Sequence, residues 1–112
     1  MNNNPANYTE FWDFYVSEHL NPLNRLLHFV GTSLGMVLLV WFLASEKFLY
    51  IPLCFVCGYG FAWFGHFVIE KNKPATFRFP LWSFISDYRM VFYMLTGKMN
   101  AEVDRITTNF KK

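Results

Sequence analysis

Three histidines and one glutamate are the residues whose types and spacing point to metal chemistry. His19 and His28 lie nine positions apart around an Asn-Pro step, and His66 precedes Glu70 by one helical turn on the same face. These are the only histidines among 112 residues. Imidazole and carboxylate ligands suit iron, zinc, copper or manganese, and three histidines, or two with one carboxylate, are typical of non-haem Fe(II) sites. The spacing by itself does not choose among these metals.

An antiparallel pair of helices would bring these side chains together. His28 lies 18 residues before the charged turn at residues 46–47, and His66 lies 19 residues after it. Two helices of equal rise that meet at this turn therefore place both rings at the same depth. Gly31 and Gly35 follow His28 on one helical stripe, and small residues allow membrane helices to approach closely. His19, just before the Asn-Pro step, would lie at the same end of the pair.

Two uncharged windows predict that both helices cross a membrane. Residues 26–45 and 48–69 contain no charged side chain, and a helix needs about 20 mostly apolar residues to span the hydrocarbon core. The composition is 54% hydrophobic and 21% aromatic, which is more than a soluble domain of this length can bury. The alternative is a helical hairpin buried inside a soluble fold.

The expected architecture is an all-α integral membrane protein with one domain over residues 1–112. It consists of an antiparallel two-helix transmembrane hairpin with flanking amphipathic, interfacial helices. Thr9 is expected to cap the first helix, while Asn21 and Pro22 are expected to start the second. The predicted segments are an interfacial helix at 8–20, transmembrane helices at 22–45 and 48–70, an amphipathic helix at 81–96 and a charged tail at 99–112.

The distribution of basic residues predicts the orientation. The hairpin turn carries only Lys47, whereas residues 71–112 carry eight lysines and arginines. The positive-inside rule therefore places both termini in the cytoplasm, with the chain in the inner membrane of a bacterium or the endoplasmic reticulum of a eukaryote. No nucleic-acid-binding motif accompanies these basic residues, so we expect a lipid and membrane partner and no nucleic acid.

Two other functions use the same residues. Two histidines at one depth could ligate a b-type haem for electron transfer, although the small residues around His28 and His66 bring the helices too close for a haem. Alternatively, the polar side chains could form hydrogen bonds that hold the helices of a small non-catalytic membrane scaffold or assembly protein together. This alternative predicts no metal.

Two blocks of the sequence resemble a known family over about residues 8–105. They are YVSEHLNPLNRLLHFVGT and GYGFAWFGHFVIEKNKPATFRFPLWSFISDYRM. They are similar to the signature blocks of a small membrane-protein family long catalogued as a domain of unknown function, of which this chain is a short form. The fungal member is a 2-hydroxy fatty acid dioxygenase in phytosphingosine breakdown. The shared pattern is Tyr15…His19…Asn24…His28-x-x-Gly31, then Gly65-His66-x-x-x-Glu70-x-Asn72-x-Pro74-Ala75-Thr76.

The resemblance implies an Fe(II)-dependent dioxygenase that uses O2 to shorten a 2-hydroxy fatty acid by one carbon at the membrane. Fe2+ would be held by His19, His28 and His66. Glu70 would be a fourth ligand, or an acceptor that orients an imidazole.

As a hypothesis, residues around this metal have supporting roles. Asn24 and Asp87 would not bind the metal themselves but would form hydrogen bonds to the histidines that do. Arg78 or Arg25 would pair with the substrate carboxylate, because a guanidinium binds a carboxylate in a bidentate manner.

Overall fold

The computed structural model describes residues 4–110, and within this range every regular element is helical. The long helices are α1 (Tyr8–Ser17), α2 (Pro22–Ala44), α3 (Pro52–Phe64), α4 (Pro80–Thr96) and α5 (Met99–Phe110). Three short helical turns connect them: η1 (Phe48–Tyr50), η2 (Gly65–Glu70) and η3 (Ala75–Phe77).

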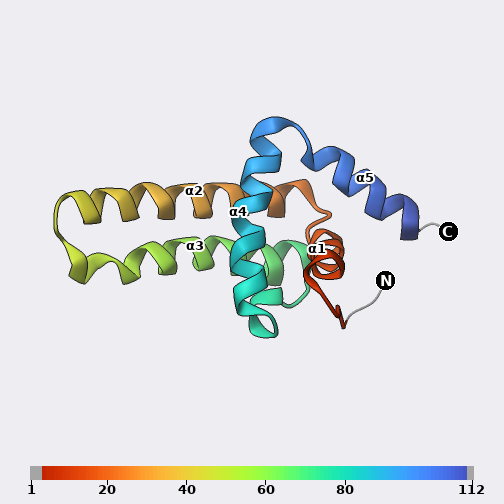
Figure 1. Cartoon of the computed structure of the whole chain (residues 1–112), viewed down its shortest axis with the longest axis horizontal. Coiled ribbons are helices and arrows are strands. Elements are labelled where there is room, and N and C mark those ends of the chain that lie inside the picture. The colour runs from red at the N-terminus through yellow and green to blue at the C-terminus, as the bar shows by residue number, and fades with distance from the viewer. Residues whose placement is uncertain (1–3, 111–112) are drawn as a thin grey trace.

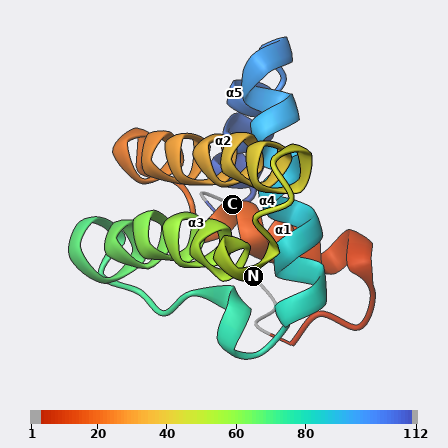
Figure 2. The same cartoon turned by 90° about the vertical axis from the view of Figure 1, so that its left-hand side faces the viewer.

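The helices α2 and α3 lie side by side, run in opposite directions and project from the rest of the molecule (Figure 1, Figure 2). The segments Pro22–Ala44 and Phe48–Glu70, of 23 residues each, are long and apolar enough to cross a membrane. Only 17% of the residues in each apolar window are buried inside the protein. These helices are therefore not the enclosed core of the fold, since most of their apolar side chains face outward.

Glycines allow α2 and α3 to approach closely. A Cβ added to Gly31 would lie 2.7 Å from the Cβ of Phe61, and one added to Gly35 would lie 2.9 Å from the carbonyl oxygen of Cys54. Both distances are too short for a side chain, so glycine is required for this helix packing.

The first helix begins at residue 8, as predicted, but its N-cap and its end differ from the prediction. Asn7, rather than Thr9, is the N-cap: its backbone is extended and its side chain accepts the N–H of Glu10 at 2.9 Å. The helix ends at Ser17 and does not reach residue 20. The reason is the start of α2, where Asn21 caps the helix and Pro22 is its first residue. Four residues are needed to turn the chain between the two helices, and His19 is one of them.

The second apolar segment is not one regular α-helix, as was expected for residues 48–70. It begins with the turn η1, continues as α3 from Pro52, and its last turn, η2, widens to a π-helix. Lys71 then ends the helix in the left-handed conformation (φ 59°). Single π-helical turns often occur at functional sites, and this one carries His66.

The helix α4 crosses one face of the α2–α3 pair (Figure 1, Figure 2) and buries its polar side. Ser83, Ser86 and Asp87 are buried, whereas Leu81 and Leu95 are each 69% exposed. The apolar stripe that the sequence predicts on residues 81–96 therefore faces outward, which is the opposite of a helix in a soluble fold.

The predicted charged tail is a packed helix as far as the structure describes it, and Lys111 and Lys112 lie outside the described residues. Ile106 of α5 is fully buried, and Arg105 Nη2 lies 2.7 Å from Asp13 Oδ1 on α1. The helices α1, α4 and α5 thereby enclose a small core at the base of the pair, formed by Phe11, Trp12, Phe14, Tyr15, Val16, Ala75, Met90, Met99 and Ile106.

Candidate metal centre

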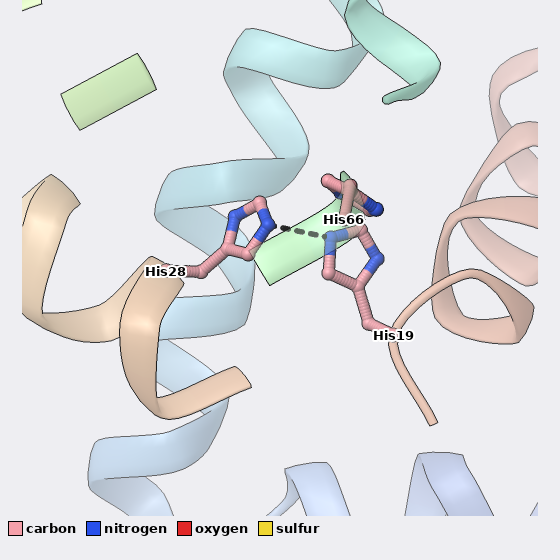
Figure 3. A group of neighbouring side chains, drawn as sticks. All are labelled: His19, His28 and His66. Atoms are coloured by element: carbon pink, nitrogen blue, oxygen red, sulfur yellow. Dashed lines mark hydrogen bonds between the residues drawn. The ribbon is translucent and has the colours of Figure 1, made fainter. Parts of the chain in front are cut away.

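The three histidines meet at the base of the α2–α3 pair, and each comes from a different element (Figure 3). His19 lies in the turn after α1, His28 in α2 and His66 in η2. Their ring centroids are 4.4, 4.5 and 4.9 Å apart, and their exposed fractions are 0%, 3% and 2%. The rings of His28 and His66 lie next to each other, as the count of residues to the turn predicted. One potential ligand atom from each ring falls within 4.8 Å of the other two.

Hydrogen bonds at Nδ1 set the tautomers of two rings. His19 Nδ1 lies 2.6 Å from the carbonyl oxygen of Tyr15, and His66 Nδ1 lies 2.7 Å from Oδ1 of Asn72. A carbonyl oxygen only accepts, so each Nδ1 carries the proton in the neutral ring. The Nε2 of each ring then offers a lone pair, which is the form that binds a metal.

The amide of Asn72 is itself held in one orientation by Glu18. The Nδ2 of Asn72 donates to the backbone oxygen of Glu18 at 3.2 Å and to its carboxylate at 2.8 Å. Both groups only accept, so Oδ1 of Asn72 must face His66. The backbone N–H of Asn72 also donates to the carbonyl oxygen of His66 at 2.9 Å. His66 is therefore fixed through both its ring and its main chain.

His28 completes the group, and it is the only one of the three rings whose Nδ1 has no hydrogen-bond partner among the described residues. Its Nε2 lies 3.1 Å from Nε2 of His19, and its Nδ1 lies 3.6 Å from Oδ1 of Asp87, too far for a hydrogen bond. The same oxygen of Asp87 accepts the hydroxyl of Tyr15 at 2.5 Å. Without a cation, one of the two facing Nε2 atoms must hold a proton, and a proton on His28 Nε2 leaves a bare Nδ1 facing a carboxylate.

The facing Nε2 atoms of His19 and His28 fit a metal ion, and a ligand atom of His66 lies within 4.8 Å of them. Imidazole ligands bind at about 2.0–2.1 Å, so two neighbouring ligand nitrogens lie about 3.0–3.4 Å apart. The 3.1 Å between the two Nε2 atoms falls in that range. A cation between the rings would take the lone pair of His28 Nε2 and leave its proton on Nδ1, which faces Asp87. Among the described residues, Nδ1 of His28 has no hydrogen-bond partner, and a metal on Nε2 would direct the proton of Nδ1 toward this carboxylate.

The electrostatics of the site agree with this. Burial, together with the neighbouring rings of His28 and His66, holds the pKa of His19 well below its ordinary value. His19 therefore stays neutral at physiological pH, as a ligand must.

Glu70 and Arg25 hold the turn that carries His19. The Oε1 of Glu70 accepts the backbone N–H of Asn21 at 2.5 Å, and Glu70 is not in the group of three. Arg25 Nη1 donates to the carbonyl oxygens of His19 and Leu20 at 2.8 and 2.9 Å. In the structure, both residues hold the turn that positions His19.

The remaining predicted residues are Asn24 and Arg78. Asn24 is fully buried against Gly65, and neither polar atom of its side chain has a hydrogen-bond partner among the described residues. Arg78 follows η3, where it is exposed, donates to Asn4 at 2.5 Å and lies over the ring of Phe79.

Sequence reasoning gave no role to Tyr15, Glu18 or Asn72. Tyr15 and Asn72 belong to the pattern shared with the family, and Tyr15 lies one helical turn before His19. The contact of Asn72 with His66 depends on the π-helical turn and the left-handed Lys71, and no sequence signal reveals these.

Comparison with known proteins identifies the family. The family model described as 2-hydroxy-palmitic acid dioxygenase Mpo1-like matches residues 5–99, which include the three histidines and Tyr15, Glu18, Asn72 and Asp87. No curated protein and no solved structure matches the chain. Because the match covers most of the chain and the whole of the histidine site, the chain belongs to the Mpo1-like family.

Proposed function

We propose that this protein is an Fe(II)-dependent dioxygenase in a membrane that shortens 2-hydroxy fatty acids by one carbon. The observation that carries the proposal is the convergence of His19, His28 and His66, with an oriented Nδ1 on two of the rings and a carboxylate facing the third. The description of the family, which names a 2-hydroxy-palmitic acid dioxygenase, supports the reaction and the substrate class.

The proposed reaction balances without another reductant. A 2-hydroxy acid, RCH(OH)COOH, and one O2 contain the atoms of RCOOH, CO2 and H2O. The bond between C1 and C2 breaks, C2 becomes the new carboxyl carbon, and O2 accepts the four electrons. Bound Fe(II) would supply the means of activating O2.

The ligand set favours an anionic substrate. Three neutral imidazoles would leave the full charge of a divalent cation at the site, which attracts a carboxylate. Arg25 adds a positive charge that is close enough to contribute to the lowered pKa of His19. We therefore favour Arg25 over the exposed Arg78 as the cation nearest the substrate carboxylate.

The membrane placement rests on the apolar surfaces. The α2–α3 pair would span the bilayer, and α4 would lie at the interface with Leu81, Ile85, Phe92 and Leu95 facing lipid. The basic segment after the pair would keep both termini in the cytoplasm. A haem function is disfavoured, because three rings packed within 4.9 Å leave no room for a porphyrin between them.

An assay of the reconstituted protein tests the proposal. Protein purified anaerobically in mild detergent and loaded with Fe(II) is given 2-hydroxypalmitic acid and O2. We expect the acid one carbon shorter, with equal amounts of O2 consumed and CO2 released, and no product from palmitic acid itself. His66→Gln should lose both the iron and the activity. A wild-type protein that holds iron and leaves 2-hydroxy acids of every chain length unchanged would overturn the proposal.

A further inference from the structure

A groove lies between the helix pair and α4, beside the candidate metal centre. It encloses about 440 Å³ of space free of protein atoms, counted together with the open space at its mouth. Three elements contribute to it. Its lining is Gly31, Thr32, Gly35 and Leu39 from α2, Cys54, Phe55, Gly58 and Tyr59 from α3, and Asp87 and Tyr88 from α4.

The inner end of the groove touches the histidine site. Asp87 lines the groove, and its Oδ1 lies 3.6 Å from Nδ1 of His28. Gly31, which also lines it, is three residues after His28 on α2. The polar atoms of the lining are concentrated in Asp87, Thr32 and the two tyrosines, and the charge of Asp87 is already engaged by the hydroxyl of Tyr15.

The groove runs from the histidines toward the far turn of the helix pair. On α2 its lining extends from Gly31 to Leu39, which is about 12 Å at the rise of an α-helix. On α3 it extends in the same direction from Tyr59 to Cys54. Leu39 and Phe55 therefore form the end most distant from the metal site, and both are apolar.

A second hollow on the helix pair has no such connection. It is larger, about 680 Å³, and entirely apolar in its lining, which is Leu27, Val56, Cys57, Gly60, Phe61 and Phe64. No residue of α4 contributes to it. Unlike Asp87, none of its lining side chains pairs with a ring of the three histidines. By volume alone, this hollow would be the better candidate for a ligand site. The groove under α4 is preferred because it contacts the histidine site.

We propose that the groove under α4 binds the acyl chain of the 2-hydroxy fatty acid, with the carboxyl and 2-hydroxyl groups at the histidines and the chain running past Leu39. This assignment rests on the proposed function for its head group. It makes Leu39 and Phe55, at the far end of the groove, determinants of the acyl length that the protein accepts.

Photo-crosslinking locates the chain without relying on turnover. The full-length, Fe(II)-loaded protein is irradiated with a 2-hydroxy fatty acid that carries a diazirine in the middle of its chain, and labelled peptides are mapped with and without excess unlabelled acid. We expect competed label on Thr32, Leu39, Phe55 or Tyr59. Competed label confined to the second hollow, or label that no acid displaces, would overturn the assignment.

Filling variants test the assignment by chain length. Leu39→Trp should lower the affinity for long chains about ten-fold, because each methylene excluded from an apolar site weakens binding several-fold, and should leave short chains unaffected. Val40→Trp is the matched control, since Val40 is the next residue and is 66% exposed. Gly60→Leu fills the second hollow, where an added Cβ meets nothing within 4 Å. Retained iron in each variant reports an intact site.

The outcomes separate the two proposals. A changed length preference in Gly60→Leu but not in Leu39→Trp would place the chain in the second hollow and refute the groove. Competed label in the groove without turnover of any 2-hydroxy acid would support the acyl site and refute the proposed reaction. Turnover of 2-hydroxy acids with label only outside the groove would support the proposed reaction and refute the acyl site.

Discussion

Replacing Asn72 tests whether the orientation and tautomer of His66 are set for metal binding. The Asn72→Ala variant removes the acceptor for His66 Nδ1, at 2.7 Å, and both donor contacts to Glu18, at 3.2 and 2.8 Å. The ring of His66 is then free to rotate or to carry its proton on Nε2, which would block the ligand position. The change touches no metal-binding nitrogen directly, so a loss of metal would act through the orientation of His66 or through Glu18, the neighbour of His19.

The size of the effect follows from these contacts. Loss of a group that orients a histidine ligand costs about 10–100-fold in metal affinity. That corresponds to about 1.4–2.7 kcal/mol of binding free energy. The metal-free protein should also lose about 1–3 kcal/mol of unfolding free energy, because a donor of His66 and acceptors of Glu18 are left unpaired. The lower half of that range applies, since these contacts are only partly buried.

Competition against a chelator of known affinity measures the metal binding of each variant in detergent. Asn72→Asp keeps an acceptor for His66 and loses the donors to Glu18, so it should retain more affinity than Asn72→Ala. Asn100→Ala, at an exposed position of α5, is the control for an asparagine substitution as such. Wild-type affinity in Asn72→Ala, or equal losses in the alanine and aspartate variants, would refute the reasoning.

Three further predictions concern the surroundings of the site. Tyr15→Phe removes the hydroxyl that Asp87 accepts at 2.5 Å and should lower metal affinity about ten-fold in the same chelator assay; unchanged affinity would argue against a role for this carboxylate. Gly35→Ala, whose added Cβ would lie 2.9 Å from a backbone oxygen of α3, should destabilise the protein by about 1–3 kcal/mol in denaturant unfolding, while Gly60→Ala should be nearly neutral; equal effects would contradict the close packing. Because the pKa of His19 is lowered from 6.5, the unfolded chain takes up a proton there before the folded chain does. The metal-free protein should thus lose up to about 1.4 kcal/mol of stability per pH unit as the pH falls below about 6.5, and an unchanged slope in His19→Gln would contradict this.

The sequence predicted those parts of the structure that follow from regular geometry. The equal distances from the charged turn placed His28 and His66 at one depth, because both helices rise by the same amount per residue. The glycines of α2 predicted close packing, which the short distances from Gly31 and Gly35 to α3 now show.

The parts that sequence reasoning did not reach depend on irregular backbone. The spacing of His66 and Glu70 predicts one shared face only for an α-helix, whereas η2 is a π-helical turn. There Glu70 bonds to the turn before α2, and Asn72 takes the place beside His66. The buried polar side of α4 was equally unpredictable, because an apolar stripe does not reveal whether it faces a core or lipid.

X-ray absorption spectroscopy of the Fe(II)-loaded protein tests the metal centre most directly. The chain contains only three histidines, so the number of imidazole ligands identifies the residues without further assignment. We expect about one iron per chain with three imidazoles in the wild type. Each His→Gln variant should lose the iron, and Glu70→Gln should leave the spectrum unchanged. A protein that binds no iron, or an iron with fewer than three imidazoles in the wild type, would contradict the site described here.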